Sequence, residues 1–188
     1  MMRPENFLTK CFDRDNPPRL DRSKRAGTLS LKEIRGLIDG NPHDFEGTRG
    51  EAARGLLLLW HDHWEDAHAI AQSDEGEPHH DLMHAIAHRR EEDFANAGYW
   101  FREAGEHEAF KTLAGRARGL LESPDDKFVS SLRARVLPAG AWSAKGFLEA
   151  VKAAKTTKSP ARDAEEKVLR ALQAEEIITA FESWTNLR

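Results

Sequence analysis

Apolar residues recur every three or four positions along most of the chain, which is the spacing of one face of an α-helix. An early segment shows this spacing clearly: Leu31, Ile34, Leu37 and Ile38. The last segment repeats it over a longer stretch that ends near Trp184. Strict alternation of apolar and polar residues, which marks a half-buried strand, is nearly absent, and only residues 128–129 and 135–137 suggest short extended pieces. The pattern predicts an all-α protein.

Signals for helix ends divide this pattern into segments. Ser30 with Glu33, and Thr48 with Glu51, have the spacing of a capping box, in which each side chain satisfies a backbone N–H of the first helical turn. Pro78 suits the first turn of a helix over about 79–91, because that turn needs no proline N–H. Further helices are expected over 94–104 and 106–121, after Ser143, and after Ser159 and Pro160.

The 188 residues are enough for one domain with an appended segment. Residues 1–27 contain three prolines and little periodicity, so we expect an irregular N-terminal arm. Residues 28–188 are expected to form a single compact helical domain, in which 159–188 is a C-terminal helix. The basic, polar stretch 152–158 predicts an exposed break before that helix.

Composition argues against several classes of protein. The net charge of −4 disfavours nucleic acid as the main partner. The longest apolar run, residues 56–60, is far shorter than the roughly 20 residues of a membrane-spanning helix, so we expect no membrane partner. The start of the chain lacks the apolar core of a signal peptide, and the single cysteine, Cys11, cannot form an intrachain disulfide. Both features make the cytoplasm the expected location.

Charge and histidine are concentrated in one window of the chain. Residues 61–93 contain ten Asp and Glu, only two Arg, and seven of the nine histidines. Even spreading would place fewer than two histidines there, so this window is where we look for chemistry.

The same window contains an internal repeat. Residues 62–68 align with residues 92–98 at an offset of 30, and each copy has a polar pair, an aromatic residue, two polar residues and an alanine. The aromatic and alanine positions are Trp64 and Ala67 in the first copy, and Phe94 and Ala97 in the second. Such a pattern favours two antiparallel helices that approach closely through small residues.

This repeat resembles the turn between the two helices of a tetratricopeptide repeat (TPR) over about residues 50–105. The resemblance implies stacked antiparallel helical hairpins, with the remaining helices completing the core, and a binding or scaffolding role. Two unrelated helical hairpins remain an alternative explanation. The segments 60–62, 88–91 and 96–101 also resemble an uncharacterised bacterial protein family, which implies no activity.

The strongest candidate for a metal or ligand site is the pair His84 and His88, because residues four apart in a helix share a face and can offer two nitrogens to a metal. Glu91 follows on the same side. If the hairpins stack, we expect His61 and Asp62 to approach this pair from the neighbouring hairpin. Such a set suits zinc, iron or manganese with an open position for water, with a carboxylate as ligand or base.

Two other interpretations of the histidines stay open: buried hydrogen bonds with nearby carboxylates, and simple exposure to solvent. Three secondary candidates carry weaker signals. His68 shares the face of His61 only if the helix is continuous through 61–68. Arg89 could clamp an anionic ligand or pair with adjacent carboxylates, and Trp60 could line a groove or lie in the core.

The leading hypothesis for function is a non-catalytic TPR-like binding or scaffolding protein, since the chain has no phosphate-binding loop, nucleophile elbow or dinucleotide fingerprint. Its partner would be an unidentified protein or small molecule, and the last helix could also mediate a homodimer. The alternative is a metal-dependent hydrolytic enzyme that uses the histidine cluster. A third possibility is a metal-free small-molecule pocket lined by His and Trp.

Overall fold

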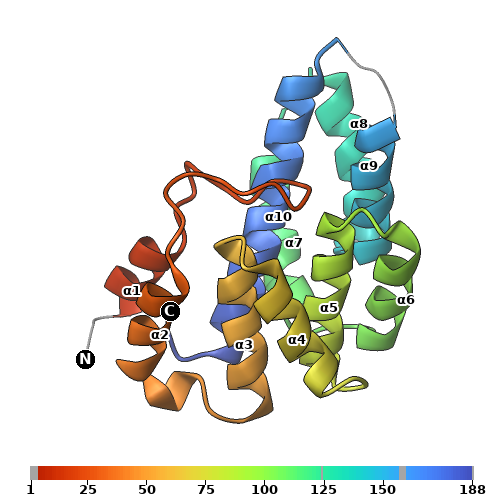
Figure 1. Ribbon diagram of the computed structural model, residues 1–188. Helices are drawn as coiled ribbons and strands as arrows, with labels where there is room; N and C mark the ends of the chain where they lie inside the picture. The colour runs from red at the N-terminus through yellow and green to blue at the C-terminus, as the bar shows by residue number, and fades with distance from the viewer. Residues whose placement is uncertain (1–3, 124, 157–159, 188) are drawn as a thin grey trace.

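The computed structural model describes residues 4–123, 125–156 and 160–187, and this part of the chain is all-helical (Figure 1). The α-helices are α1 (Pro4–Cys11), α2 (Leu31–Asp39), α3 (Gly47–Trp60), α4 (Trp64–Ser73), α5 (Pro78–Arg90), α6 (Phe94–Ala104), α7 (Ala109–Leu120), α8 (Lys127–Val136), α9 (Ala144–Thr156) and α10 (Arg162–Trp184). Two short 3₁₀ turns, η1 (Pro42–Asp44) and η2 (Pro138–Gly140), lie between them. The all-α prediction is confirmed. None of the helices in these ranges has the length and apolarity needed to cross a bilayer.

Most of the expected helix starts are found where the sequence places them. Ser30 caps α2 with the complete capping box that its spacing to Glu33 predicts. Pro78 occupies the first turn of α5, and the Ser143 hydroxyl accepts the Gly146 N–H at the start of α9. Thr48 is not a cap, because α3 already begins at Gly47. The Ser159 signal lies outside the described residues.

The extended pieces expected at 128–129 and 135–137 are wrong, since all but the last of these residues lie in α8. The Asp126 carboxylate accepts the Val129 N–H at 3.1 Å and so starts a helix there. Val129, Leu132 and Val136 follow at helical spacing and are all buried. Valine has a high strand propensity, but the spacing of these apolar residues by three or four positions indicates a helix.

The N-terminal arm differs in its first part from the irregular segment expected over 1–27, because Pro4–Cys11 form α1. Residues 12–30 contain no helix and cross one face of the molecule before reaching α2 (Figure 1). Side chains of α5 and α10 bind the backbone carbonyls of this segment. Arg90 of α5 donates to the carbonyls of Arg19 and Asp21, and Gln173 of α10 donates to those of Pro18 and Arg19.

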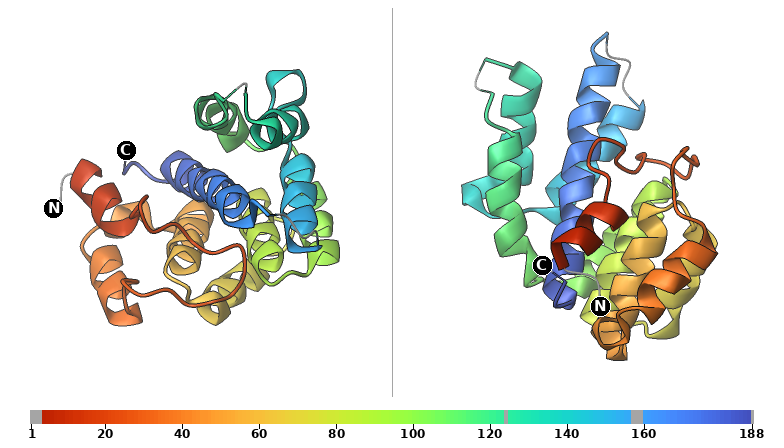
Figure 2. Two further views of the ribbon diagram at one scale, coloured as in Figure 1. Left: turned by 90° about the horizontal axis from the view of Figure 1, so that it is seen from above. Right: turned by 90° about the vertical axis from the view of Figure 1, so that its left-hand side faces the viewer.

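The longest helix, α10, runs through the middle of the molecule, with α7 on one side and α3 on the other (Figure 2). Two helical hairpins, α3–α4 and α5–α6, lie next to each other, and α4 packs against α5. On the other side of the second hairpin, α6 packs against α9. This arrangement places α5 between α4 and α6, so side chains on one face of α5 meet both neighbours.

The two hairpins turn in the same way, thirty residues apart. Asp62 and Glu92 both adopt a left-handed conformation, with φ of 62° and 64°. In each turn, the next residue donates its N–H five residues back: His63 to the Leu58 carbonyl and Asp93 to the His88 carbonyl, both at 3.0 Å. The offset found in the sequence is therefore the offset between two matching turns.

A buried ion pair ties α5 to α10. Arg89 donates to Glu176, and the same guanidinium reaches the Gln173 side-chain oxygen at 3.3 Å. Both charged side chains are at most 1% exposed. Because either charge would be costly to bury without its partner, the pair fixes the position of α5 on α10.

We expect Glu176→Ala to lower the free energy of unfolding by about 3–5 kcal/mol, because it leaves the Arg89 charge buried without its partner. The double variant Arg89→Met with Glu176→Leu should recover most of this loss, since it removes both charges. Urea unfolding followed by circular dichroism measures the difference. Equal losses in the single and double variants would show that the pair is not the cause.

Candidate metal centre

Three imidazole rings converge on the face of α5 that meets α4. The Nε2 atom of His84 lies 3.1 Å from Nε2 of His68 and 3.0 Å from Nε2 of His88. All three nitrogens lie within 4.8 Å of one another. His84 and His88 are buried and His68 is half-buried. This is the only such group of three or more His, Cys, Asp and Glu donors among the described residues.

Local structure explains how the three rings meet. His84 and His88 stand one helical turn apart on α5, with their rings stacked at 4.6 Å between centroids. His68 comes from the next helix over, α4, and joins them because α4 packs on α5. The turn at Asp62 sets the start of α4 and therefore the height at which His68 reaches the pair.

Two indole rings hold the histidines from either side. Trp64 stacks on His68 with centroids 4.6 Å apart, and Trp100 of α6 stacks on His84 at 4.3 Å. Trp64 is itself fixed, because its indole N–H donates to the Ala87 carbonyl at 3.3 Å. The imidazoles are therefore oriented by packing, as a ligand set must be if it is to bind without reorganising.

Hydrogen bonds alone cannot satisfy the three nitrogens. An imidazole nitrogen carries either one proton or one lone pair in the ring plane, so His84 Nε2 can make a good hydrogen bond to only one of its two neighbours. His88 Nδ1 lies 3.1 Å from the Glu91 carboxylate, which places the proton on Nδ1 and leaves the Nε2 lone pair facing His84. His84 Nδ1 is buried without a partner, so the hydrogen-bonding contacts of this ring are those of its Nε2.

The surroundings favour the neutral form of His84 and His68. Burial lowers the pKa of His84 to about 3, and the neighbouring His88 and His68 act in the same direction. Burial and His88 also lower the pKa of His68, although the Glu91 charge opposes this shift. Neutral imidazoles have the lone pairs that a metal needs, so a cation can occupy this place where protons do not.

The other residues proposed from the sequence lie elsewhere or play a supporting part. Glu91 contacts the cluster through His88. The His61 ring is buried away from it, and its Nδ1 accepts the Leu29 N–H at 3.1 Å. Trp60 packs edge-on against Phe12 in the core.

Asp62 and Arg89 belong to structural ion pairs. Asp62 accepts from Arg25 Nε at 3.0 Å and from Arg90 Nη2 at 2.8 Å. Burial would raise the Asp62 pKa, but these two arginines outweigh it and lower the pKa below its ordinary value. Because both carboxylate oxygens are engaged, Asp62 is not available as a ligand or base for the cluster. Arg89 is engaged by Glu176 on the central helix and does not reach the cluster.

Arg22 is a neighbour of the cluster that the sequence does not indicate. Arg22 belongs to the arm that crosses the molecule, and its guanidinium lies 3.8 Å from the centroid of the Trp64 ring. It also pairs with Glu65 at 3.1 Å and with Glu91 at 3.3 Å. Arg22 and Glu91 are 69 positions apart in the sequence, so no local spacing could have revealed the contact.

Comparison with protein-family models, with curated proteins and with solved structures finds no significant match for this chain. A functional assignment therefore rests on the geometry of the histidine cluster.

The position of His61 leads to a pH prediction. Burial, followed by the charges of Arg25 and His63, lowers the His61 pKa from 6.5 to about 4. The folded protein thus resists a proton that the unfolded chain accepts, so stability present above pH 6.5 is lost as the pH falls toward 4. This group contributes a slope of at most about 1.4 kcal/mol per pH unit.

We therefore expect His61→Gln to flatten the decline of unfolding free energy between pH 6.5 and 4, as measured by urea titrations across that range. The control is His43→Gln, whose side chain is 81% exposed and should keep the wild-type decline. An unchanged slope in His61→Gln would contradict the assignment.

Proposed function

We propose that this protein is a divalent-metal protein, with zinc as the expected ion, whose three-histidine centre serves a hydrolytic reaction. One observation carries the proposal: Nε2 of His84 faces two other Nε2 atoms at 3.0 and 3.1 Å, an arrangement that one hydrogen bond cannot satisfy. Two nitrogens bound at 2.0–2.1 Å to one tetrahedral zinc lie about 3.3 Å apart. The two separations at His84 are within a few tenths of an ångström of this value, and the three donor nitrogens all lie within 4.8 Å of one another.

The donor set favours zinc over iron, manganese and magnesium. Neutral imidazole suits zinc, whereas manganese and magnesium prefer oxygen ligands, and non-haem iron is commonly held by two histidines with a carboxylate. The Glu91 carboxylate does not need to reach the ion, because its place beside His88 Nδ1 is that of a supporting carboxylate. From there it orients the ring and strengthens His88 as a donor.

A zinc ion held by three imidazoles supplies a Lewis acid with one position left for water, which is the arrangement of hydrolytic rather than structural zinc sites. The residues of this chain do the positioning. Trp64 and Trp100 fix the planes of His68 and His84. Glu91 sets the tautomer of His88, and its charge is shared with Arg22 on the rim.

We also propose that the scaffold of the centre is a TPR-like stack. The matching turns support this, as do the small residues in the hairpin seams: Gly55, Ala67, Ala85 and Ala97, all buried. In this arrangement the cluster lies in the groove that α4 and α6 form over α5. A non-catalytic binding role, which is the alternative function, is compatible with the same fold. Whether the protein binds a metal distinguishes this alternative from hydrolysis.

Protein purified without a histidine tag should contain about one zinc per chain, measured by elemental mass spectrometry, and His84→Ala should lose it. The control His43→Ala replaces an exposed histidine and should keep the metal. Circular dichroism shows whether His84→Ala remains folded. A metal-free wild-type protein whose melting temperature ignores added zinc would remove the proposal.

The open position and its chemistry can be tested separately. Cobalt(II) loaded into the protein should give a visible spectrum that changes when azide is added, because azide takes the position left for water. The loaded protein should hydrolyse an activated ester such as p-nitrophenyl acetate, and a chelator should stop it. Bound metal with an azide-insensitive spectrum and no hydrolysis would indicate a structural site instead.

Glu91→Gln should weaken zinc binding by about 10–100-fold, because an amide is a poorer acceptor for the His88 Nδ1 proton than a carboxylate. A competition titration against a chromogenic chelator measures the dissociation constant. The matched control is Glu65→Gln, which also removes a charge that pairs with Arg22 but does not touch a histidine of the cluster. Equal losses in both variants would mean that only the local negative charge matters.

A further inference from the structure

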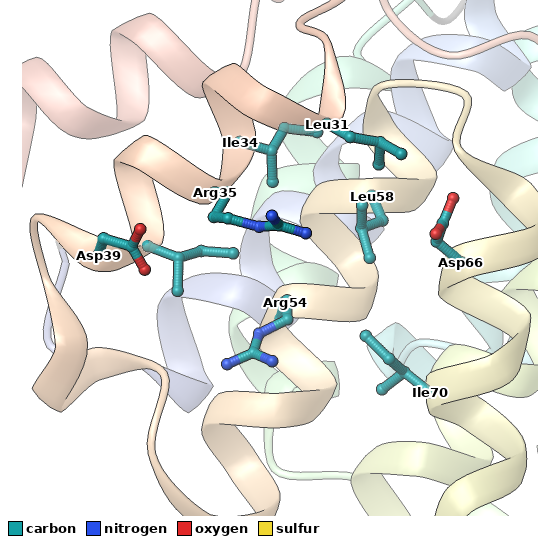
Figure 3. A pocket seen from close by; sticks show the side chains of 9 residues that line it. Leu31, Ile34, Arg35, Asp39, Arg54, Leu58, Asp66 and Ile70 are labelled. Atoms are coloured by element: carbon teal, nitrogen blue, oxygen red, sulfur yellow. The ribbon is translucent and has the colours of Figure 1, made fainter.

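A second groove lies one hairpin earlier, between α2, α3 and α4, and contains a pocket of about 330 Å³ (Figure 3). Five aliphatic side chains from the three helices line it, among them Leu58 and Ile70. Four charged side chains complete the lining: Arg35, Asp39, Arg54 and Asp66. A pocket of this size, with apolar walls and a few polar groups, is suited to a small molecule.

This pocket occupies the same place in the fold as the histidine cluster. The offset of 30 between the hairpins relates Arg54 to His84 and Leu58 to His88. Arg35 is the fifth residue of α2, as His68 is the fifth residue of α4. Both α2 and α4 pack against the first helix of the hairpin that follows them. The groove is thus repeated, but nitrogen lone pairs at one site are replaced by guanidinium groups at the other.

The two guanidinium groups have no anionic partner in the described part of the protein. Neither the exposed Arg35 nor the half-buried Arg54 forms an ion pair there. Figure 3 shows both groups projecting into the space between α2 and α3. The Arg54 Nε is buried and makes no hydrogen bond, which is costly for a donor on a charged group.

The remaining charges restrict what can bind. Asp39 and Asp66 lie at opposite sides of the pocket in Figure 3, away from the space between the two arginines. The two aspartates repel the double charge of a phosphate monoester more strongly than the single charge of a carboxylate, and a carboxylate matches the planar donor fork of an arginine. The aliphatic walls favour a ligand whose body is a hydrocarbon chain.

We propose that this pocket binds a small aliphatic carboxylate, with Arg35 and Arg54 receiving the carboxylate and the aliphatic walls enclosing the chain. The proposal stands independently of the metal centre, because it uses no residue of the histidine cluster.

Hexanoate is a suitable probe, titrated into the full-length protein by isothermal titration calorimetry. Acetate, which lacks the chain, and 1-hexanol, which lacks the charge, should each bind at least 10-fold more weakly. Hexyl phosphate should also bind more weakly because of the two aspartates. Arg54→Met should weaken hexanoate binding at least 10-fold, whereas Arg49→Met should not change it, since Arg49 lies on the same helix but outside the pocket.

Methyl NMR of the wild-type protein provides a test that needs no variant. Hexanoate should shift the methyl signals of Leu58 and Ile70, and those of Leu132 and Ile178, outside this pocket, should stay unchanged. The proposal is overturned if hexanoate does not bind, if 1-hexanol binds as tightly, or if the shifts map elsewhere. Tighter binding of hexyl phosphate would overturn the choice of a carboxylate.

Discussion

The packing of α4 on α5 is the contact on which the candidate site depends. It brings His68 to two histidines that α5 already holds one turn apart, and it is anchored by the hydrogen bond from the Trp64 indole to the Ala87 carbonyl. If α4 slid by one residue, it would rotate His68 by about 100° around its helix and separate the three nitrogens. The left-handed residue at Asp62 prevents this, because it fixes where α3 ends and α4 begins.

Buried charges hold this arrangement in place rather than form the site. Asp62 is clamped by Arg25 of the arm and Arg90 of α5, so the turn before α4, the arm and α5 meet at one carboxylate. On the other side of α5, Arg89 is bound to Glu176 of α10. Each of these groups is costly to bury unless its partner is present, which makes the packing specific as well as stable. The acidic and basic residues that look catalytic in the sequence are thus largely committed to architecture.

The repeated groove shows how one geometry can present different chemistry. At the second hairpin the groove holds three imidazole donors beside a carboxylate, which suits a cation. At the first, equivalent positions present guanidinium groups, which suit an anion. Both sites use the first helix of a hairpin together with the helix that precedes it.

Much of the helical structure was determined by the sequence alone. The apolar spacing, the Ser30 capping box, Pro78 in the first turn of α5 and the thirty-residue repeat are all local features, and local features act through neighbouring backbone groups. The pairing of His84 with His88 belongs here too, since four residues along a helix always share a face. These contacts need no knowledge of the rest of the chain.

Only the tertiary structure decided which third side chain completes the cluster. His61 and His68 were both available in the sequence. His61 ends α3 and its ring accepts the Leu29 N–H, whereas the packing of α4 on α5 brings His68 to the cluster. Arg22 and the arginine pocket were likewise hidden, because residues far apart in sequence meet there. Spacing along a chain specifies which face of a helix a residue occupies, but the neighbour of that face is chosen by the packing of the whole core.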